Sequence, residues 1–589
     1  MHNAVAFANN DLITIAWSYD TRPDGCLGFA VYRLDPSGAR TPLPSHAVWP
    51  GEQIKPGQTT VDYPIQKFSW KDPYARLEAE RTGQRSFRYA IVPLQGPLHH
   101  LQAMPNLPEL TTNDVTLTSK VSPGVAAVFN RGLISTQRVS RAMHGHPAPK
   151  SLVAEVSKPA SPLRASLSGD MVETLLGFLD RAATDGTIYA ALYELGDDKL
   201  ITKLQGLGRR LRLVLSNAIK KDEHTGTAID SNQPARELLA ISDGEQHNRI
   251  FGPNQIGHNK FAIYTDTHNN PVAVLLGSTN WTPTGLCTQT NNTLVIDDPT
   301  LAARYLDYWQ HLARDTDDAH NNPKALQGPT LRTWDATPAT IELADHSATA
   351  QSWFSPNTPK LRGKPAGETR PADMAALIEH INNAQHAILF LAFYPGTPSI
   401  ANWAADALRA KPDLFVRGCV THPSAAESFY YELTGNQPPR HTPGTPTTPV
   451  KQDYRVIAAE ALDNTIPPGW QKELLNAGFA VIHDKIVVID PFTDNCVVAT
   501  GSHNLGHKAS YNNDENLLIL AGHRTLAAAY TTHVLDIYDH FAWRYRVNHS
   551  PQPDNPSLDT NPDQWLNRYY DPTGQITNPQ LRFWTQAII

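Results

Sequence analysis

Cysteine is scarce in this sequence, and it lacks long apolar runs and an excess of basic residues. The four cysteines (Cys26, Cys287, Cys419 and Cys496) lie far apart and form no CxxC pair. This spacing predicts no disulfide framework and favours a reducing compartment. No apolar stretch approaches the length of a membrane span, and the N-terminal segment has no basic region followed by a long apolar one. We therefore expect a cytoplasmic protein, or one exported without a cleavable signal peptide.

The charge balance is mildly acidic. The 50 Lys and Arg residues are outnumbered by 57 Asp and Glu residues, which gives a formal net charge of −7. A dedicated nucleic-acid-binding protein is usually basic, so the balance argues against one while leaving room for a local basic groove. Histidines gather at 97–101 and 143–149 without Cys or acidic partners, and this pattern predicts solvated loops rather than metal sites.

The first hundred residues show the pattern of a small β-sandwich. Three apolar, aromatic-rich segments separated by Gly, Pro and Asp are expected strands: 12–20, 28–35 and 86–94. The aromatic residues Trp17, Tyr32 and Tyr89 resemble those of a fibronectin type III-like domain, although core packing alone explains them. We assign residues 1–105 to this domain and expect it to bind a protein partner or to target the protein.

From about residue 120 a helix followed by apolar strands occurs twice. The first copy comprises a helix over 170–183 and strands over 187–195 and 211–217; the second comprises a helix over 373–384 and strands over 387–395 and 414–420. Two copies of one unit indicate a duplicated domain. The expected divisions are 106–335, 336–550 and a C-terminal tail, 551–589, that packs back through its aromatic residues. A Pro- and Thr-rich insertion at 435–451 is an expected surface loop.

Each copy also contains a His-x-Lys segment. The segments are "IGHNKFAIYTD" (256–266) and "VIHDKIVVID" (481–490), and each precedes a second apolar strand that ends in Gly-Ser-x-Asn, within 272–281 and 496–505. One His-x-Lys would occur by chance, whereas the whole arrangement twice in a duplicated unit is a specific signal. Titrating groups are costly in a buried strand unless something compensates them, so we expect these to line a site.

The chemistry of these residues suits a tetrahedral phosphate. Residues two apart in a strand point to the same face, so His258 projects with Lys260 and His483 with Lys485. The candidate phosphate-binding residues are Lys260, Lys485, Asn280, Asn504, Ser278 and Ser502. If the copies pack about a pseudo-twofold, these groups converge and stabilise the transition state of phosphoryl transfer. One imidazole can attack phosphorus while the other protonates the leaving oxygen.

These residues resemble the paired HKD motifs of the phospholipase D superfamily, over residues 120–545. The text "HDKIVVID…GSHN…NDENLLIL" is similar to bacterial phospholipase D-like and cardiolipin synthase-like proteins. The resemblance implies an α/β fold: two pseudo-twofold-related phospholipase D-like sandwich halves that follow a small all-β sandwich. It also implies an active site complete within one chain, a phosphohistidine intermediate, and no metal or other cofactor.

The two copies differ in ways that predict separate roles. The family places Asp five residues after Lys; Asp490 fits, whereas the first copy has Thr265. Aligning 290–296 with 513–519 sets Asn292 opposite Glu515. In the family, an acid or amide here orients a histidine of the other half, and a carboxylate on Nδ1 makes Nε2 a better nucleophile. We therefore predict His258 as nucleophile, partnered by Glu515. His483, oriented by Asn292, is the predicted general acid and then base. Alternatively, Glu515 is an ordinary surface carboxylate.

Three functions remain open. The leading one is a metal-independent phosphodiesterase that hydrolyses or transfers phospholipid head groups, with a phospholipid or membrane surface as partner. The second is a nuclease or nucleic-acid end-processing phosphodiesterase that uses the same site, so nucleic acid is the alternative partner. The third is a degenerate binding scaffold, which is disfavoured because all eight motif residues of the two copies are present.

Overall fold

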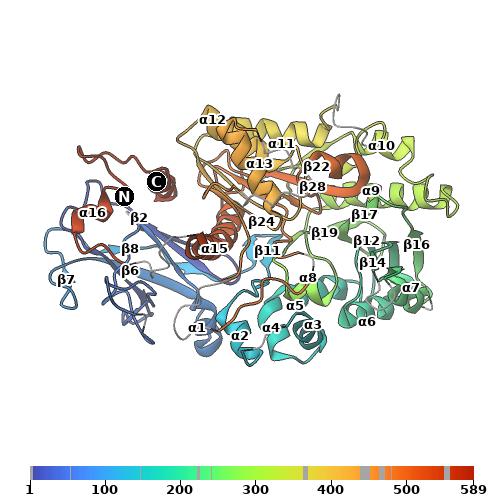
Figure 1. The fold of residues 1–589 in the computed structure, drawn as a ribbon. Coiled ribbons are helices and arrows are strands. Elements are labelled where there is room, and N and C mark those ends of the chain that lie inside the picture. The colour runs from blue at the N-terminus through green and yellow to red at the C-terminus, as the bar shows by residue number, and fades with distance from the viewer. Residues whose placement is uncertain are drawn as a thin grey trace.

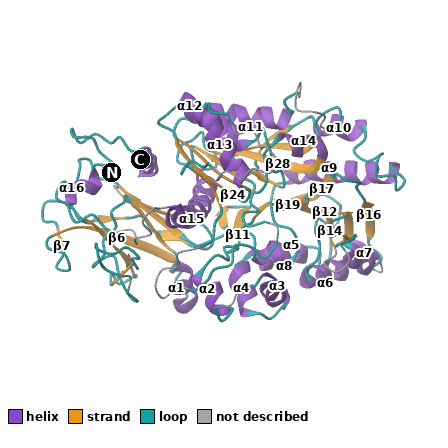
Figure 2. Ribbon diagram, in the orientation of Figure 1, coloured by secondary structure: helices purple, strands orange, loops and turns teal. Residues whose placement is uncertain are grey.

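The computed structural model describes residues 4–53, 55–145, 148–221, 226–240, 242–361, 369–437, 451–462, 471–478, 480–549 and 557–588. Most of the insertion predicted at 435–451 lies outside these residues. The fold is α/β, as predicted, with a β-rich N-terminal part on one side and two larger halves around a long central helix (Figures 1 and 2).

The N-terminal part contains two antiparallel sheets. One sheet has the order β1 (Ala4–Ala8), β2 (Ile13–Trp17) and β5 (Ser69–Asp72). The other has β4 (Arg40–Pro42), β3 (Gly28–Leu34), β6 (Ser86–Gln95) and β7 (Gln102–Ala103), with β8 (Leu110–Thr111) and β9 (Val115–Thr116) also paired to β6. Helix α1 (Ala75–Thr82) connects β5 to β6. The predicted strands at 12–20, 28–35 and 86–94 are β2, β3 and β6.

The two halves repeat one sheet topology. The first sheet runs β10 (Lys120–Ser122), β11 (Val125–Phe129), β20 (Asn292–Ile296), β19 (Pro271–Gly277), β18 (Lys260–Thr265), β12 (Thr187–Leu192), β13 (Leu211–Ser216), β16 (Glu245–Arg249). The second runs β21 (Ala339–Glu342), β22 (Thr349–Ser355), β28 (Asn513–Ala521), β27 (Val497–Gly501), β26 (Ile486–Ile489), β23 (Ala387–Ala392), β24 (Phe415–Val420), β25 (Val456–Ala458). In both halves three parallel strands at one end of the sheet, β12, β13 and β16 or β23, β24 and β25, follow the antiparallel strands in the same order.

Helices cover the outer faces of both sheets and fill the space between them. The first half contributes α2 (Gln137–Ala142), α3 (Pro149–Ser157), α4 (Pro162–Ser168), α5 (Met171–Asp180), α6 (Asp198–Leu207), the short 3₁₀ helix Gly208–Arg210, α7 (Gln233–Ala240), α8 (Pro283–Cys287), α9 (Pro299–Asp318) and α10 (Pro329–Asp335). The second contributes α11 (Ala372–Asn383), α12 (Ile400–Ala410), α13 (Pro423–Thr434), α14 (His507–Asn512) and α15 (Arg524–His549). A small hairpin, β14 (Ile219–Lys221) and β15 (Ala228–Asp230), lies beside the first sheet.

The central core joins the halves. Apolar residues of both sheets pack together with the inward faces of α9 and α15, and this shared cluster is why α15 appears in the middle of Figure 1. The outer helices of each half form separate clusters with their own sheet. Helices α16 (Pro562–Leu566) and α17 (Pro579–Ile588) return to the N-terminal part, where Trp565 and Tyr570 enter the core of the β-sheets.

Backbone pairing also links the halves at two places. Strand β17 (Ile256–Gly257) belongs to the first half by sequence but pairs in parallel with β28 of the second. Ile482 of the second half forms a parallel bridge to Thr290 of the first. The segment 481–490, predicted as one strand, is therefore regular only from Ile486, because the backbone N–H of His483 donates to the carbonyl of Thr290, 3.0 Å away, in the other half.

Candidate active site

The four side chains of the His-x-Lys segments meet between the halves. Lys260 opens β18, and Lys485 lies directly before β26. His258, Lys260, His483 and Lys485 are all buried, with 3% of each histidine exposed. The two imidazole rings lie edge to face with their centroids 6.3 Å apart. The structure thus brings these four predicted residues into one small space.

Glu515 lies against His258 from the other half. The Nδ1 atom of His258 is 2.8 Å from Glu515 Oε2 and 3.1 Å from the backbone carbonyl oxygen of Ser502. Both neighbours are acceptors, so Nδ1 carries the hydrogen and Nε2 of the neutral ring keeps its lone pair. Glu515 is fully buried and its Oε1 accepts a bond from Asn513, which excludes the alternative of a surface carboxylate.

Asn291, rather than the predicted Asn292, contacts His483. The Nδ1 atom of His483 lies 2.9 Å from Asn291 Oδ1, which also accepts a bond from the Ser278 hydroxyl at 2.8 Å. The Asn291 amide nitrogen donates to Gly285 O, so its oxygen must face the imidazole. His483 therefore also donates from Nδ1 and presents an unprotonated Nε2, but its partner is a neutral amide.

The error with Asn292 is a shift of one residue in the alignment. Asn292 and Asn516 each follow the Ser of the Gly-Ser turn by 14 residues and donate their backbone N–H to its hydroxyl. Asn292 is thus the counterpart of Asn516, and Asn291 is the counterpart of Glu515. Asn292 and Asn516 both reach into the opposite half. Asn292 donates to the hydroxyls of Thr500 and Tyr530, and Asn516 donates to Asn259.

The two lysines sit in matching surroundings. Lys260 Nζ donates to the carbonyl of His258 and lies 5.0 Å from the Tyr193 ring centroid. Lys485 Nζ donates to the carbonyl of His483 and lies 5.4 Å from the ring of Phe393. Burial lowers the pKa of Lys260 to about 7, although Glu515 and Glu194 oppose the shift.

The electrostatics of the site favour an anion. Burial, together with the neighbouring Lys260, holds the pKa of Lys485 well below its usual value. Burial lowers the pKa of His258 to about 4, with Glu515 opposing the shift and Lys260 adding to it. The pKa of His483 is lowered further below its usual range by burial and by both lysines. A phosphate between these groups would offset the repulsion and raise all four pKa values.

The predicted amides and serines do not all face the same way. Asn280 donates to Glu194, a residue that our sequence analysis did not select. In the described part of the chain, the Oδ1 atoms of Asn280 and Asn504 are buried without a partner. The Ser278 hydroxyl bonds to Asn291 and Asn292, and the Ser502 hydroxyl accepts two bonds from Asn516. These hydroxyls therefore join neighbouring strands. Ser278 donates its hydrogen to Asn291, whereas Ser502 accepts both of its bonds, so the predicted phosphate contact of the serines stays a prediction.

The motif aspartate lies away from the histidines. The carboxylate of Asp490 accepts three bonds from the backbone N–H groups of Gln385, His386 and Ala387, at the start of β23. In the first half Thr265 instead ends β18, opposite Thr187 of β12. Replacing Asp by Thr in that half therefore changes a strand terminus and leaves the chemical groups of the site in place.

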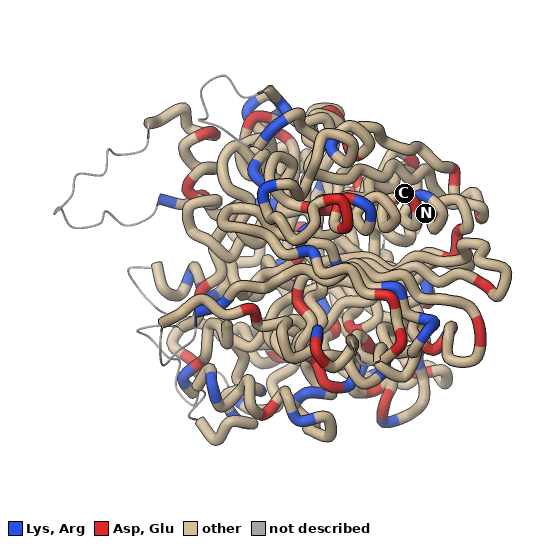
Figure 3. The backbone as a smooth tube through the Cα atoms, turned by 90° about the vertical axis from the view of Figure 1, so that its right-hand side faces the viewer, with Lys and Arg blue, Asp and Glu red and all other residues tan. Residues whose placement is uncertain are grey.

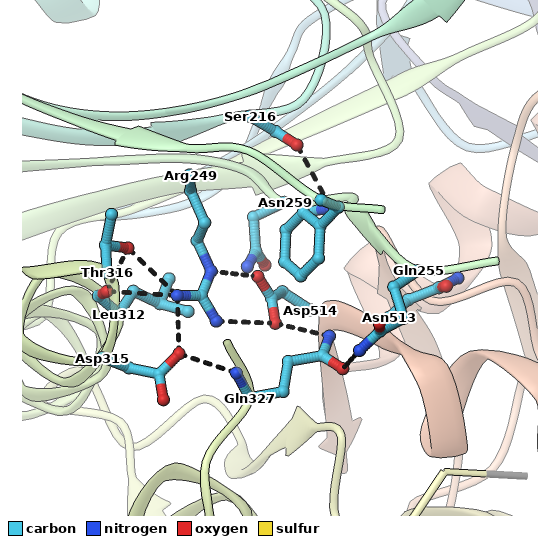
Figure 4. A network of polar contacts seen from close by, with 12 residues as sticks. Ser216, Arg249, Gln255, Asn259, Leu312, Asp315, Thr316, Gln327, Asn513 and Asp514 are labelled. Atoms are coloured by element: carbon cyan, nitrogen blue, oxygen red, sulfur yellow. Dashed lines mark hydrogen bonds and ion pairs between the residues drawn. The ribbon is translucent and has the colours of Figure 1, made fainter. Parts of the chain in front are cut away.

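A buried ion-pair network supports the pairing of His258 with Glu515 (Figure 4). Arg249, at the end of β16, contacts both carboxylate oxygens of Asp514, at 2.5 and 3.3 Å, and Asp315 at 2.7 Å. Gln327 donates to the same carboxylate at 3.0 Å. The carbonyl of Asp514 accepts the backbone N–H of His258, and the next residue is Glu515. Arg249 therefore fixes, from the first half, the strand of the second half that carries Glu515.

Some of the missed residues left a signal in the sequence. Counting from the Gly-Ser turns, rather than matching apolar letters, would have found Asn291. Glu194 and Tyr193 follow the strand that pairs with the His-x-Lys strand, a position at which a polar residue points toward a site. Arg249 left no signal, because its partners Asp315 and Asp514 come from distant parts of the chain.

The described residues also bear on metal binding and on membrane crossing. Among them, no three His, Cys, Asp or Glu side chains gather in a way that could hold a metal ion. None of the helices in the described part of the chain is both long enough and apolar enough to span a bilayer.

Comparison with known families adds a description for the second half. Residues 377–537 match the family described as "Cardiolipin synthase, PLD-like domain". The matched segment lies within the second half. It holds His483, Lys485, Asn504 and Glu515 of the site. No curated protein matches the chain in sequence.

Solved structures with some similarity include phosphodiester-processing proteins. The phosphatidylserine synthase of Haemophilus influenzae Rd KW20 is 13% identical, with 65% of this chain and 88% of that chain covered and a TM-score of 0.41. Nuc from Salmonella typhimurium, a phospholipase D family member, is 23% identical over 25% of this chain and 87% of its own, with a TM-score of 0.20. Yeast tyrosyl-DNA phosphodiesterase is 10% identical over 59% and 86%, with a TM-score of 0.32. All three TM-scores are below 0.5, so none of these similarities indicates an activity for this chain.

Proposed function

We propose that the protein is a metal-independent phosphodiesterase that hydrolyses or transfers the head groups of phospholipids. The observation that carries the proposal is the buried pair of imidazoles, each with its Nδ1 hydrogen held and its Nε2 lone pair available, between two lysines. Such a site can bind a phosphate diester, attack its phosphorus and protonate its leaving oxygen without further groups.

The unequal partners of the two histidines support unequal roles. The Glu515 carboxylate stabilises positive charge on His258 as Nε2 forms a bond to phosphorus, so we assign the nucleophile to His258. His483 has only the neutral Asn291 behind it and releases a proton more readily. In the free site its Nε2 carries no hydrogen, but a bound phosphate raises the pKa of His483, so Nε2 takes up a proton as the substrate binds. The imidazolium then gives this proton to the leaving alcohol, and the neutral ring afterwards takes a proton from water or from an accepting alcohol. Lys260 and Lys485 bind the phosphate oxygens most strongly in the transition state.

The proposed lipid substrate rests on the family match of the second half and on charge. Residues 377–537 match a cardiolipin synthase-type domain, and the chain has a net charge of −7. Figure 3 shows acidic and basic segments interspersed over the side that it displays, rather than a continuous basic track. A polyanion such as DNA gains its affinity from arrays of Lys and Arg, whereas a single lipid phosphate needs only the lysines of the site.

One observation favours the nuclease alternative. Lys220, on the β14–β15 hairpin, is half exposed and lies 3.5 Å from Glu194, beside the site. Lys221 is its exposed neighbour on the same hairpin. Two lysines at this position could contact the backbone phosphates of a nucleic acid on either side of the cleaved bond.

The test is a side-by-side assay in excess EDTA. Full-length protein is incubated with mixed phospholipid vesicles in one set of tubes and with single- and double-stranded DNA in the other. We expect released head group, intact DNA and no effect of EDTA. Cut DNA with intact lipid would select the nuclease, and activity that disappears in EDTA would reject the metal-free mechanism.

Two variants connect the activity to the site. His258→Asn should abolish turnover, whereas His346→Asn should not, because His346 also pairs with a glutamate at 2.8 Å but lies on the surface. In the His483→Asn variant, a diester with a good leaving group should leave its phosphoryl group on His258. Peptide mass spectrometry would locate this adduct, and an adduct on any other residue would contradict the assignment.

A further inference from the structure

A second cavity lies where the N-terminal part, α15, β24 and α17 meet. Its volume is about 350 Å³, and none of the active-site side chains lines it. This size falls within the range of roughly 300–1,000 Å³ that is usual for small-molecule sites. Aromatic rings form much of its wall: Trp70 and Tyr74 from the N-terminal part, Phe415 from β24 and Trp584 from α17. We call this space the junction cavity.

The charged residues of the junction cavity do not balance. It is lined by Lys67, Lys71 and Arg417 but by only two carboxylates, Asp536 and Asp539. Lys71 uses both of them, with its Nζ 3.0 Å from Asp536 and 3.1 Å from Asp539. Within the described part of the chain, no carboxylate oxygen lies within 4.0 Å of a nitrogen of Lys67 or Arg417. The cavity therefore holds more cations than it can pair.

The two remaining cations are placed to meet a ligand. Lys67 is an exposed residue of the cavity wall, and partial loss of solvation together with the neighbouring Arg546 and Lys71 lowers its pKa despite Asp539. The Arg417 guanidinium stacks 4.4 Å from the Phe415 ring centroid and donates Nη1 to the carbonyl of Val416. The ring centroids of Tyr538 and Tyr454 lie 5.3 and 5.4 Å from the same guanidinium, and among the described residues its remaining N–H groups have no hydrogen-bond acceptor. An anion here would relieve the repulsion among the cations and gain charge-assisted hydrogen bonds.

The histidines of the cavity add no charge. His46 and His540 both line it, and burial lowers the pKa of each, strongly so for His540. At neutral pH they are uncharged, so the three cations and two carboxylates decide the local field. The combination of excess positive charge and aromatic walls suits a compound with an anionic group on an aromatic or apolar body.

We propose that the junction cavity is a second ligand site, which binds a small phosphate-, phosphonate- or carboxylate-bearing compound with an aromatic or apolar body. Lys67 and Arg417 bind the anionic group, and the aromatic walls contact the rest. The ligand bridges the N-terminal part and the second half and stabilises their contact. It also touches the helix that supports the proposed catalytic centre: α15 places His533 3.1 Å from Asp484, which lies between His483 and Lys485, and lines the cavity within the next two turns, from Leu535 to His540.

The experiment is a calorimetric titration of the full-length protein with phenylphosphonate, which carries a dianion on a ring and is not hydrolysed. Because the active site should also bind it, we expect two sites. Lys67→Met and Arg417→Gln should each weaken one site at least tenfold. Lys260→Met should weaken only the other. The matched control is Lys199→Met, which removes a lysine from a different surface hollow and should change neither site.

The variants separate this proposal from the proposed function. A wild-type protein that shows only the site dependent on Lys67 and Arg417 would count against the phosphodiesterase but would support the junction cavity as a ligand site. Binding that is unchanged in both Lys67→Met and Arg417→Gln, or wild-type protein that shows only the Lys260-dependent site, would overturn the cavity proposal. Inorganic phosphate that binds the second site as tightly as phenylphosphonate would contradict the role of the aromatic walls. Quenching of tryptophan fluorescence that is lost in Trp70→Phe would place the ring in the cavity.

Discussion

At the scale of single residues, Asn291 and Asn292 show how one position separates chemistry from assembly. Successive side chains at the start of β20 point to opposite sides. Asn291 therefore faces His483, whereas Asn292 crosses into the other half and bonds to two hydroxyl groups. A carboxamide at the first position positions an imidazole, and the same carboxamide at the second holds two sheets together.

The two asparagines should therefore fail in different ways. Asn291→Leu removes the acceptor of the His483 Nδ1 hydrogen, so we expect kcat to fall by about 100-fold. Because the Ser278 hydroxyl and the Gly285 carbonyl also lose this partner, the unfolding free energy should fall by about 1–3 kcal/mol as well. Asn292→Leu leaves two buried hydroxyls without a partner, which costs about 1–3 kcal/mol of unfolding free energy and changes kcat little. Steady-state kinetics measure the difference in kcat between the two variants, and urea unfolding measures their stability. A fall in kcat for Asn292→Leu but not for Asn291→Leu would favour the alignment of Asn292 with Glu515.

The lowered pKa values predict the pH dependence of kcat/KM. In the free enzyme, His258 must be neutral to attack, so kcat/KM should fall as pH drops through its pKa of about 4. Lys260 must be charged to bind phosphate, so kcat/KM should fall again as pH rises through its pKa of about 7. Lys260→Arg keeps its charge at higher pH and should move the alkaline limb upward. A wild-type profile that is flat from pH 7 to 9 would contradict the role of Lys260.

Most of the residues that carry the chemistry could be predicted from sequence. His258, Lys260, His483 and Lys485 were identifiable because a period of two in a strand fixes which side chains share a face. Glu515 was identifiable because it breaks the match between the copies. The phosphate contacts of the serines stay a prediction, because a sequence shows that a hydroxyl is near a turn but not which of several neighbours it bonds. Glu194 was missed because its neighbour Asn280 becomes adjacent only when the sheet forms.

At the scale of elements, short strands exchanged between the halves hold the site together. Strand β17 joins the sheet of the second half, and the Thr290–Ile482 bridge returns the exchange. His258 and His483 are thus each hydrogen-bonded through their own backbone to the opposite half. The His258 side is reinforced by the buried Arg249–Asp514 pair, and the His483 side by the buried contact of His533 with Asp484 at 3.1 Å.

Breaking that pair should be costly. Arg249→Met leaves Asp514 charged and buried without its main partner, so we expect a loss of about 3–5 kcal/mol in unfolding free energy. Adding Asp514→Leu should recover part of the loss, because the unpaired charge is then gone. Urea unfolding of the single and double variants measures the coupling. The surface pair of Arg81 and Glu78 provides the control, and Arg81→Met should leave the midpoint unchanged.

Element types were easier to predict than element ends. The helix predicted at 373–384 is Ala372–Asn383, because its apolar spacing is set by its own packing face. The strand predicted at 481–490 begins only at Ile486, because its first residues pair with a partner from the other half. Apolar periodicity reports which face is buried, and it is silent on which chain segment supplies the hydrogen bonds.

At the scale of the whole molecule, the C-terminal helices complete the N-terminal β-sheets. Trp565 is fully buried, donates its indole N–H to the carbonyl of Cys26 at 2.7 Å and packs against Phe29 and Phe68. Tyr569 contacts Phe68 as well. The two ends of the described chain therefore share one core, which lies beside the halves that hold the catalytic groups (Figure 1).

Removing the side chain of Trp565 should destabilise the N-terminal part before the two halves. Trp565→Ala removes a large buried ring and is expected to cost about 3–5 kcal/mol. Limited proteolysis should then cut within residues 4–116 before it cuts the two halves, and Leu361→Ala, which truncates an exposed side chain, should not change the digestion pattern. Equal protection of the N-terminal part in both variants would contradict a shared core.

Asp490, described above as a cap on the first backbone groups of β23, affects how relatives of this chain would be recognised in genomes. A search pattern that requires His, Lys and Asp selects for the imidazole and the ammonium of the site, and also for a carboxylate that only caps the start of a strand. Such a pattern accepts the second half and rejects the first, although both supply the same imidazole and ammonium. Proteins with one such copy would then be classified as inactive or as half-enzymes, because of an aspartate that lies away from the two histidines.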